Sequence, residues 1–123
     1  MNKTKRRDIP RFNTPIVETH CHLDYLEADA LGEVLDAAFE SGVERIVTIS
    51  VSADNLDTVR EIADSHDAIW CTQGIHPNEA DSWTADLGER VSRGSQHTRV
   101  VAIGEIGLDY YYDHADRDTQ KTA

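Results

Sequence analysis

The chain has 123 residues and a formal net charge of −11; 39% of its residues are hydrophobic and 28% are charged. This length supports one domain with a real core. The acidic balance disfavours a passive duplex-binding module, because it repels polyanions, but divalent cations can invert the local potential, so a nucleic-acid enzyme is not excluded. No run of about 18 apolar residues occurs, and we predict no membrane-spanning helix.

The chain begins with a basic leader, residues 1–14, which we expect to be flexible and solvated. No apolar segment follows its charges, so it does not resemble a secretory signal, and we expect a cytoplasmic protein. The basic side chains of the leader are those of Lys3, Lys5, Arg6, Arg7 and Arg11.

Strands and helices are then predicted in alternation. Residues 16–23 (IVETHCHL) are predicted to form a short strand. Apolar residues in 29–42 recur at i, i+3, i+4, i+7 and i+8, which predicts a helix with Gly42 as its C-cap. Residues 45–51 (RIVTISV) form a compact β-branched run, which is typical of a strand buried on both faces.

The alternation continues to the last residue. A helix over 55–65 precedes a third strand over 68–75 (AIWCTQGI), and a weaker helix over 84–93 precedes a fourth strand over 99–106 (RVVAIGEI). Residues 116–123 (DRDTQKTA) open a further helix. Successive β–α units predict an α/β fold with a parallel sheet and right-handed crossovers.

Two architectures fit this order of elements. One is a doubly wound sheet, but no G-x-G-x-x-G follows the first strand. The other is the N-terminal half of a (β/α)8 barrel, a fold that typically needs about 250 residues. The chemistry at the strand ends favours the half-barrel, which would occupy residues 15–123 and stop after the fourth strand.

The first strand carries two histidines, His20 and His22, near its carboxyl end. Side chains two residues apart on a strand point to the same face, so both imidazoles would project to one side and Cys21 to the other. In a parallel barrel, catalytic groups gather at this end of the strands. The pair is a candidate metal site, although a hydrogen-bonded surface pair fits the same spacing.

Glu105 follows the apolar run of the fourth strand, between Gly104 and Gly107. A carboxylate at such a place is costly unless it is paired or coordinates an ion. The alternative to metal is an ion pair with an arginine. Imidazole and carboxylate ligands together suit zinc, manganese or iron better than calcium.

Several other polar residues lie close to these positions. His76, in GIHP, either contacts a substrate phosphate or caps its loop, and Asp24 either orients a ligating imidazole or is an ordinary loop carboxylate. Asp109 is a candidate for contact with substrate or with a water on the metal. Tyr110 to Tyr112 are expected to pack their loop.

Cysteine offers a rival chemistry, because Cys21 is flanked by the two histidines and could act as a nucleophile. Strand alternation argues against this, since it turns the sulfur away from both rings. Cys21 and Cys71 lack a metal-binding spacing, and we expect two free thiols.

Three segments, ETHCHLD (18–24), GIHP (74–77) and IGEIGLDYYY (103–112), resemble in order and spacing the TatD family of metal-dependent deoxyribonucleases. The resemblance covers nearly all of the chain after the leader. It implies a (β/α)8 barrel that binds two divalent cations (Mg, Mn or Zn) and hydrolyses phosphodiester bonds in DNA.

Carried over residue by residue, the resemblance implies metal ligands at His20 and His22, a metal-bridging carboxylate at Glu105, and His76 at the rim of the site. The family's remaining ligands, two histidines and an aspartate that serves as general base, belong to strands five to eight. We therefore expect the 123 residues to be a truncated half that is inactive alone and prone to self-association.

Two other functions stay open at this point. An amidohydrolase acting on a C–N or ester bond also opens with His-x-His, but many of those barrels place a carboxylated lysine where this chain has Glu105. A half-barrel that binds metal or a partner without turnover is the non-enzymatic alternative. The substrate (DNA, RNA, a nucleotide or a D-aminoacyl-tRNA-like ester) and the native metal are not specified by the sequence.

Overall fold

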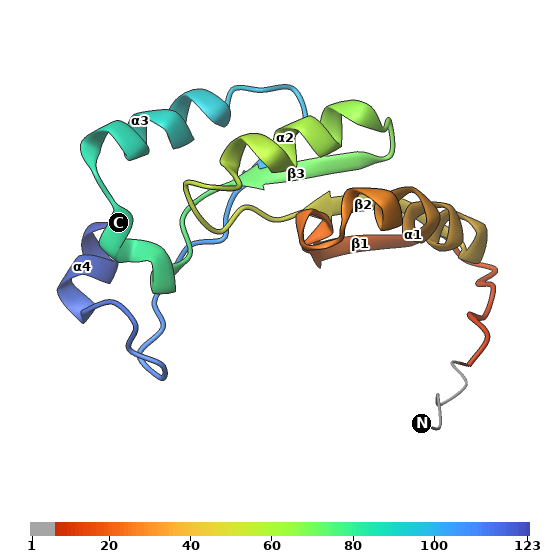
Figure 1. The fold of residues 1–123 in the computed structure, drawn as a ribbon, viewed down its shortest axis with the longest axis horizontal. Helices are drawn as coiled ribbons and strands as arrows, with labels where there is room; N and C mark the ends of the chain where they lie inside the picture. The colour runs from red at the N-terminus through yellow and green to blue at the C-terminus, as the bar shows by residue number, and fades with distance from the viewer. Residues whose placement is uncertain (1–6) are drawn as a thin grey trace.

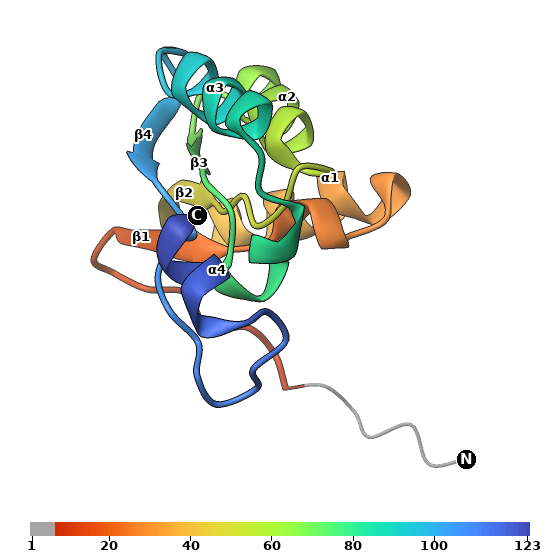
Figure 2. The ribbon, with the colours of Figure 1, turned by 90° about the vertical axis from the view of Figure 1, so that its left-hand side faces the viewer.

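The four strands of the sheet follow one another in chain order. The computed structural model describes residues 7–123, and its parallel sheet has the order β1-β2-β3-β4. The strands turn progressively from β1 to β4, as the right-handed twist of neighbouring strands requires (Figure 2). They are β1 (Ile16–Cys21), β2 (Val43–Thr48), β3 (Ile69–Gln73) and β4 (Val100–Ile103).

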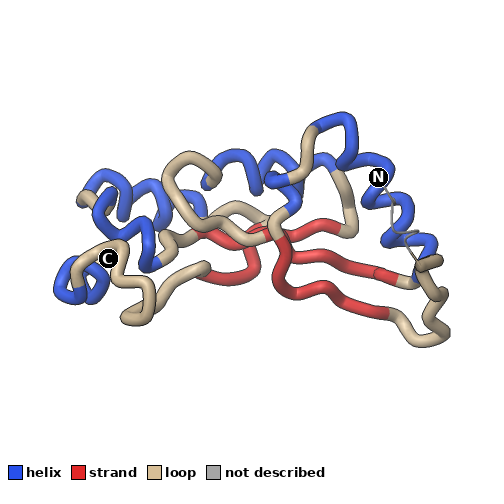
Figure 3. Tube along the Cα trace, turned by 60° about the horizontal axis from the view of Figure 1, so that its bottom comes forward, coloured by secondary structure: helices blue, strands red, loops and turns tan. Residues whose placement is uncertain are grey.

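Helices α1, α2 and α3 cover one face of this sheet, so the molecule has two layers (Figure 1, Figure 3). Gly42 ends α1 with a φ of 113°, the left-handed C-cap that the sequence predicts. The Thr84 side chain caps α3 by accepting a hydrogen bond from the Leu87 N–H. The helices are α1 (Ala28–Ser41), α2 (Leu56–Ser65), α3 (Ala85–Gly94) and α4 (Arg117–Thr122).

The core lies between the sheet and its helices. One cluster joins α1 and α2 to the sheet, and a smaller one joins α3 to the end of β3. The most deeply buried side chains of the first cluster are Leu35, Ile46, Val59, Ala63, Ile69 and Cys71.

The opposite face of the sheet is open, and one prediction is wrong here. The run 45–51 was expected to be buried on both faces; Ile46, Thr48, Ile49 and Ser50 are buried, but Arg45 is exposed and Val47 is only partly buried. No second layer covers this face among residues 7–123. Val17 and Val101 are consequently 51% and 54% exposed.

The strands are shorter than predicted at their carboxyl ends. β1 ends at Cys21, so His22 lies just beyond the ladder, where it precedes a short 3-10 helix, η1 (Leu23–Tyr25). A second 3-10 helix, η2 (Pro77–Ser82), follows β3 and was not predicted. The loops at this end of the sheet therefore have fixed local structure.

The absence of a side chain at Gly74 lets the ends of β3 and β4 approach closely. A Cβ on Gly74 would lie 2.6 Å from the carbonyl carbon of Gly104. The Gly104 N–H donates to the Gln73 carbonyl oxygen at 2.9 Å, and the Thr72 hydroxyl donates to the Gly104 carbonyl at 2.7 Å. This contact fixes where the chain leaves β4, one residue before Glu105.

Part of the leader contacts the domain: the Phe12 N–H donates to the Ser41 carbonyl oxygen at 2.8 Å. Lys3, Lys5 and Arg6 lie outside the described residues, and the flexibility of the leader stays a prediction. Between residues 7 and 123, no helix has both the length and the apolar character needed to cross a membrane.

Candidate metal centre

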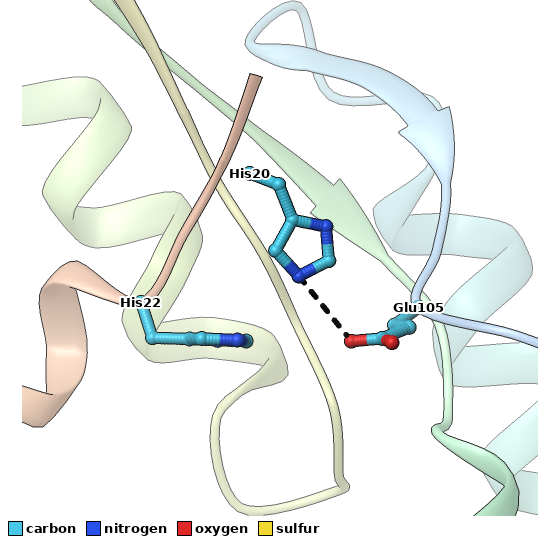
Figure 4. A group of neighbouring side chains, drawn as sticks. All are labelled: His20, His22 and Glu105. Atoms are coloured by element: carbon cyan, nitrogen blue, oxygen red, sulfur yellow. Dashed lines mark ion pairs between the residues drawn. The ribbon is translucent and has the colours of Figure 1, made fainter. Parts of the chain in front are cut away.

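His20, His22 and Glu105 come together at the carboxyl ends of β1 and β4. Each offers one ligand atom, and these atoms all lie within 4.8 Å of one another. Figure 4 shows the three side chains pointing toward one another from two segments that are far apart in the sequence. Two atoms bound at about 2.1 Å to one tetrahedral ion lie about 3.4 Å apart, so side-chain shifts on the order of 1 Å would complete coordination.

Backbone contacts hold the histidine segment in place. The Ile49 N–H donates to the Cys21 carbonyl oxygen at 2.9 Å, and the Leu23 N–H donates to the Thr48 hydroxyl at 3.1 Å. The Leu23 side chain is buried in the first core cluster. His22 is therefore positioned by anchored residues on both sides rather than by strand pairing, and strand alternation alone does not set the direction of its ring.

Glu105 is held by its backbone as well. Its N–H donates to the Ser50 carbonyl oxygen at 2.7 Å, and the Ser50 hydroxyl donates to the Gly74 carbonyl at 2.7 Å. The carboxylate is thereby placed between two imidazoles. One oxygen lies 3.6 Å from His20 Nε2, and the other lies 3.5 Å from His76 Nε2.

His76 faces Glu105 with a defined tautomer. Its Nδ1 accepts a hydrogen bond from the Asn78 N–H at 3.0 Å, so in the neutral ring the proton is on Nε2. That nitrogen is the one directed at Glu105. The ring therefore caps the start of η2, as one alternative expected, and contact of His76 with a substrate phosphate stays a prediction.

Asp24 lies close to the centre but makes a different contact from the one anticipated. Its Oδ2 accepts a hydrogen bond from the Asn55 amide at 3.1 Å, and Asn55 Oδ1 in turn accepts from the Val51 and Ser52 N–H groups. Asp24 Oδ1 and His22 Nδ1 are both buried without a hydrogen-bond partner. Asp24 therefore orients Asn55, and no hydrogen bond links it to His22.

Asp109 and the tyrosines after it lie apart from the three converging side chains. Asp109 Oδ1 accepts from the Tyr111 and Tyr112 N–H groups, which closes a turn. The Gln120 amide clamps the Asp109 backbone, accepting from its N–H at 2.7 Å and donating to its carbonyl at 2.9 Å. Tyr111 is 87% exposed, contrary to the expectation that it packs the loop.

A pocket of about 390 Å³ opens over the candidate centre, and sequence reasoning missed part of its lining. Tyr25 stacks on His22, with ring centroids 4.6 Å apart and an interplanar angle of 11°. Partial burial raises the pKa of the Tyr25 hydroxyl, and the carboxylates of Asp24, Glu105 and Glu79 add to the rise. The pocket is lined by His20, His22, Tyr25, Val51, His76, Asn78, Glu79 and Glu105.

Cys21 has none of the properties of an activated nucleophile. Burial, together with the nearby carboxylates of Glu18 and Asp24, raises its pKa to about 11. Its sulfur donates to the Val47 carbonyl oxygen at 3.7 Å, within the sheet. The thiolate is the reactive form, so a thiol held in this state is unreactive near neutral pH.

The donor set fits a divalent transition metal such as zinc, manganese or iron. Two imidazoles and one carboxylate are hard-to-borderline ligands, and His22 Nδ1 is a buried polar atom that has no protein partner. The fold and this cluster define the class: a (β/α) barrel-type protein with a candidate metal centre at the carboxyl ends of its strands.

Comparison with known proteins specifies the family. The family model described as TatD related DNase matches residues 17–123. The uncharacterized metal-dependent hydrolase YabD of Bacillus subtilis is 36% identical over 107 residues, which are 86% of this chain and 42% of that protein. The 3'-5' ssDNA/RNA exonuclease TatD of Pantoea ananatis is 35% identical over 79 residues, 63% of this chain and 30% of that protein. The chain belongs to the TatD related DNase family.

Solved structures agree with this assignment. The TatD homologue YJJV of Escherichia coli K12 superimposes with a TM-score of 0.76 at 28% identity, over 86% of this chain and 42% of that one. A TatD family hydrolase from Entamoeba histolytica, at 22% identity, has the same fold with a TM-score of 0.72, over 89% of this chain and 43% of that one. The chain thus spans less than half the length of these relatives, and the half-barrel fold class is confirmed.

Proposed function

We propose that this chain contributes the first half of a metal-dependent phosphodiesterase that acts on DNA with two divalent cations, Mg, Mn or Zn. In this proposal His20, His22 and Glu105 are metal ligands. The observation that supports it is the convergence of their ligand atoms within 4.8 Å from opposite edges of the sheet. The family membership and the exonuclease name of the Pantoea relative point to nucleic acid as the substrate.

Bound divalent cations would supply Lewis-acid polarisation of the phosphoryl group and neutralise its charge. The residues of the chain would position these cations. The Glu105 carboxylate, with one oxygen facing His20 Nε2 and the other facing His76 Nε2, would hold a cation together with His20 and His22. The His76 Nε2–H, fixed by the Nδ1 contact, faces Glu105 and would help to orient this carboxylate toward a cation.

The chain alone does not carry all the groups that this reaction needs. The relatives are more than twice as long, and the general-base aspartate and the remaining ligands are expected from their second half. We therefore propose that the 123-residue chain is inactive by itself, and that activity belongs to a protein in which a second half completes the barrel.

The test uses the gene product that includes any in-frame continuation of this sequence. Nucleotide release from a single-stranded DNA oligonucleotide is measured with Mg²⁺, Mn²⁺ or Zn²⁺, with and without chelator. We expect His20→Ala to abolish release while the circular dichroism spectrum is unchanged. His66→Ala is the matched control, because that ring lies before β3, at the amino end of the sheet, and bonds only Ser65 in the described residues.

Release that persists in chelator would contradict the proposal. Hydrolysis of amide or carboxylic-ester substrates in place of DNA would favour the amidohydrolase alternative. Tight metal binding without turnover of either class would favour a binding module.

A further inference from the structure

Tyr25 is a large aromatic side chain that the fold holds at the candidate centre without burying it. Its ring lies parallel to the His22 ring, with 4.6 Å between centroids, and the residue is 66% exposed. It lines the same pocket as His20 and Glu105. One face of the ring is therefore covered by a candidate metal ligand, and the surface that remains is open beside the pocket.

The position of the ring is well defined. Tyr25 ends the short helix η1, where its N–H donates to the His22 carbonyl oxygen at 3.1 Å. Leu23 on one side is buried, and Leu26 on the other packs against the first core cluster. Two anchored neighbours thus fix a ring that itself contributes little to the core, so stability of the core does not account for an aromatic residue here.

Apart from the imidazoles, which face the candidate centre or Glu105, the other residues that line this pocket have no aromatic ring. They are carboxylates, an amide and one valine, namely Glu79, Glu105, Asn78 and Val51. Nucleobases bind aromatic faces by stacking, irrespective of their sequence, because every base has a π face. A tyrosine ring next to a phosphodiester site is suited to this contact.

We propose that Tyr25 is the stacking platform for the nucleobase next to the scissile phosphate, which makes it a specificity-determining residue. The inference rests on the proposed phosphodiesterase function. A base inside a duplex already has both faces covered by its neighbours, so only an unpaired or splayed nucleotide can use the platform. Tyr25 would thereby select single-stranded substrate, and it would do so through the base rather than through the sugar.

The experiment compares Tyr25→Ala and Tyr25→Phe in the complete protein, with intact single-stranded oligonucleotides and with oligonucleotides that are abasic beside the scissile bond. Binding is measured by fluorescence anisotropy, and cleavage as kcat/KM. We expect Tyr25→Ala to weaken binding of the intact oligonucleotide roughly 5- to 150-fold, the range of base–aromatic stacking. Tyr25→Phe keeps the ring and should bind like the wild type.

The abasic oligonucleotide separates stacking from an indirect effect on His22. Without a base there is nothing to stack, so wild type and Tyr25→Ala should bind it equally. Tyr111→Ala is the matched control, because Tyr111 is 87% exposed and does not line the pocket. Thermal unfolding of each variant verifies that it is folded.

Each other outcome is informative. Equal losses on intact and abasic oligonucleotides would show that the ring acts only by supporting His22, and would overturn the inference. Unchanged binding of Tyr25→Ala to the intact oligonucleotide would overturn it as well, with the phosphodiesterase function intact. A wild-type protein that neither binds nor cleaves either oligonucleotide would overturn the proposed function itself.

Discussion

Glu105 illustrates how much of this site depends on single residues. Its backbone N–H is bound to Ser50, after β2, while its two carboxylate oxygens face His20 and His76. The side chain is about two-thirds buried, with 32% exposed. A carboxylate that is partly desolvated and beside two imidazoles is poised to bind a cation.

We predict that Glu105→Gln lowers the affinity for Zn²⁺ or Mn²⁺ by at least about 10-fold, because the amide keeps the shape and removes the charge that faces the cation. Isothermal titration calorimetry measures this affinity. Glu79→Gln is the matched control: Glu79 lines the same pocket but is not one of the three converging residues. An equal loss of affinity in both variants would mean that the total negative charge of the pocket, and not the position of Glu105, determines metal binding.

The two thiols should be unreactive in the folded protein. Burial raises the pKa of both Cys21 and Cys71 from the ordinary thiol value of 9.0 to about 11. Because the folded-state pKa is raised, the associated stabilisation is complete below about pH 9 and is lost as the pH rises toward 11. Iodoacetamide at pH 8 should therefore label the native chain roughly 100-fold more slowly than the unfolded chain. Cys21 labelling at the free-thiol rate would restore the nucleophile hypothesis.

At the scale of elements, the sequence predicts the strands and helices whose positions depend on local apolar periodicity. All four strands and the three long helices lie within a few residues of their predicted positions, because each has a clear apolar period and a terminator such as Gly42. The convergence of His20 with Glu105 also follows from the rule that strand carboxyl ends share one edge.

The remaining features depend on contacts between distant segments. The 3-10 helix η2 is stabilised by the His76 ring that accepts from Asn78, and the Tyr25–His22 stack depends on η1, where strand pairing has already ended. The Asp109 carboxylate accepts a hydrogen bond from the Tyr111 N–H within its own turn. A sequence pattern marks these residues as polar or aromatic but does not specify which partner each one finds.

Helix α3 packs against β3 through a glycine. A Cβ on Gly94 would lie 2.3 Å from Gln73 Oε1, and Gln73 is fully buried with its amide donating to the Leu56 carbonyl oxygen at 2.9 Å. We predict that Gly94→Ala lowers the free energy of unfolding by about 1–3 kcal/mol through overpacking.

Gly32 in α1 is the matched control for this effect, because a Cβ there meets nothing within 4 Å. Gly32→Ala should raise the free energy of unfolding by about 0.5–1 kcal/mol, as alanine is the better helix former. Urea denaturation measures both changes. Destabilisation of equal size at the two positions would show that the close approach of α3 to β3 is not the cause.

At the scale of the whole molecule, the chain has an open sheet face and two open sheet edges. Within the described residues, β1 pairs only with β2, and β4 pairs only with β3. Val17, Val101 and Ile103 are each at least half exposed on or near these edges. Unpaired strand edges beside apolar side chains favour pairing with another chain.

We therefore predict that the purified 123-residue chain self-associates at micromolar concentration, and sedimentation velocity measures this. Val101→Lys, which places a charge on an exposed edge strand, should shift the chain toward monomer. Tyr111→Lys is the control for added charge, because it changes an exposed residue outside the sheet. A wild-type chain that sediments as a compact monomer would show that four β/α units bury enough surface by themselves.

The candidate centre lies where the two edge strands of the sheet approach each other, so its geometry depends on the shape of the sheet. His20 belongs to the first strand and Glu105 follows the last, so an ion held by both would act as a cross-link across the full width of β1 to β4. Such an ion binds the folded sheet and not the unfolded chain, so it raises the free energy of unfolding by RT ln(1 + [M]/Kd). The linkage also works in reverse: a substitution that flattens the sheet, however far from the histidines, spreads the ligand atoms and weakens binding. A change in the curvature of the sheet should therefore appear as a change in metal affinity.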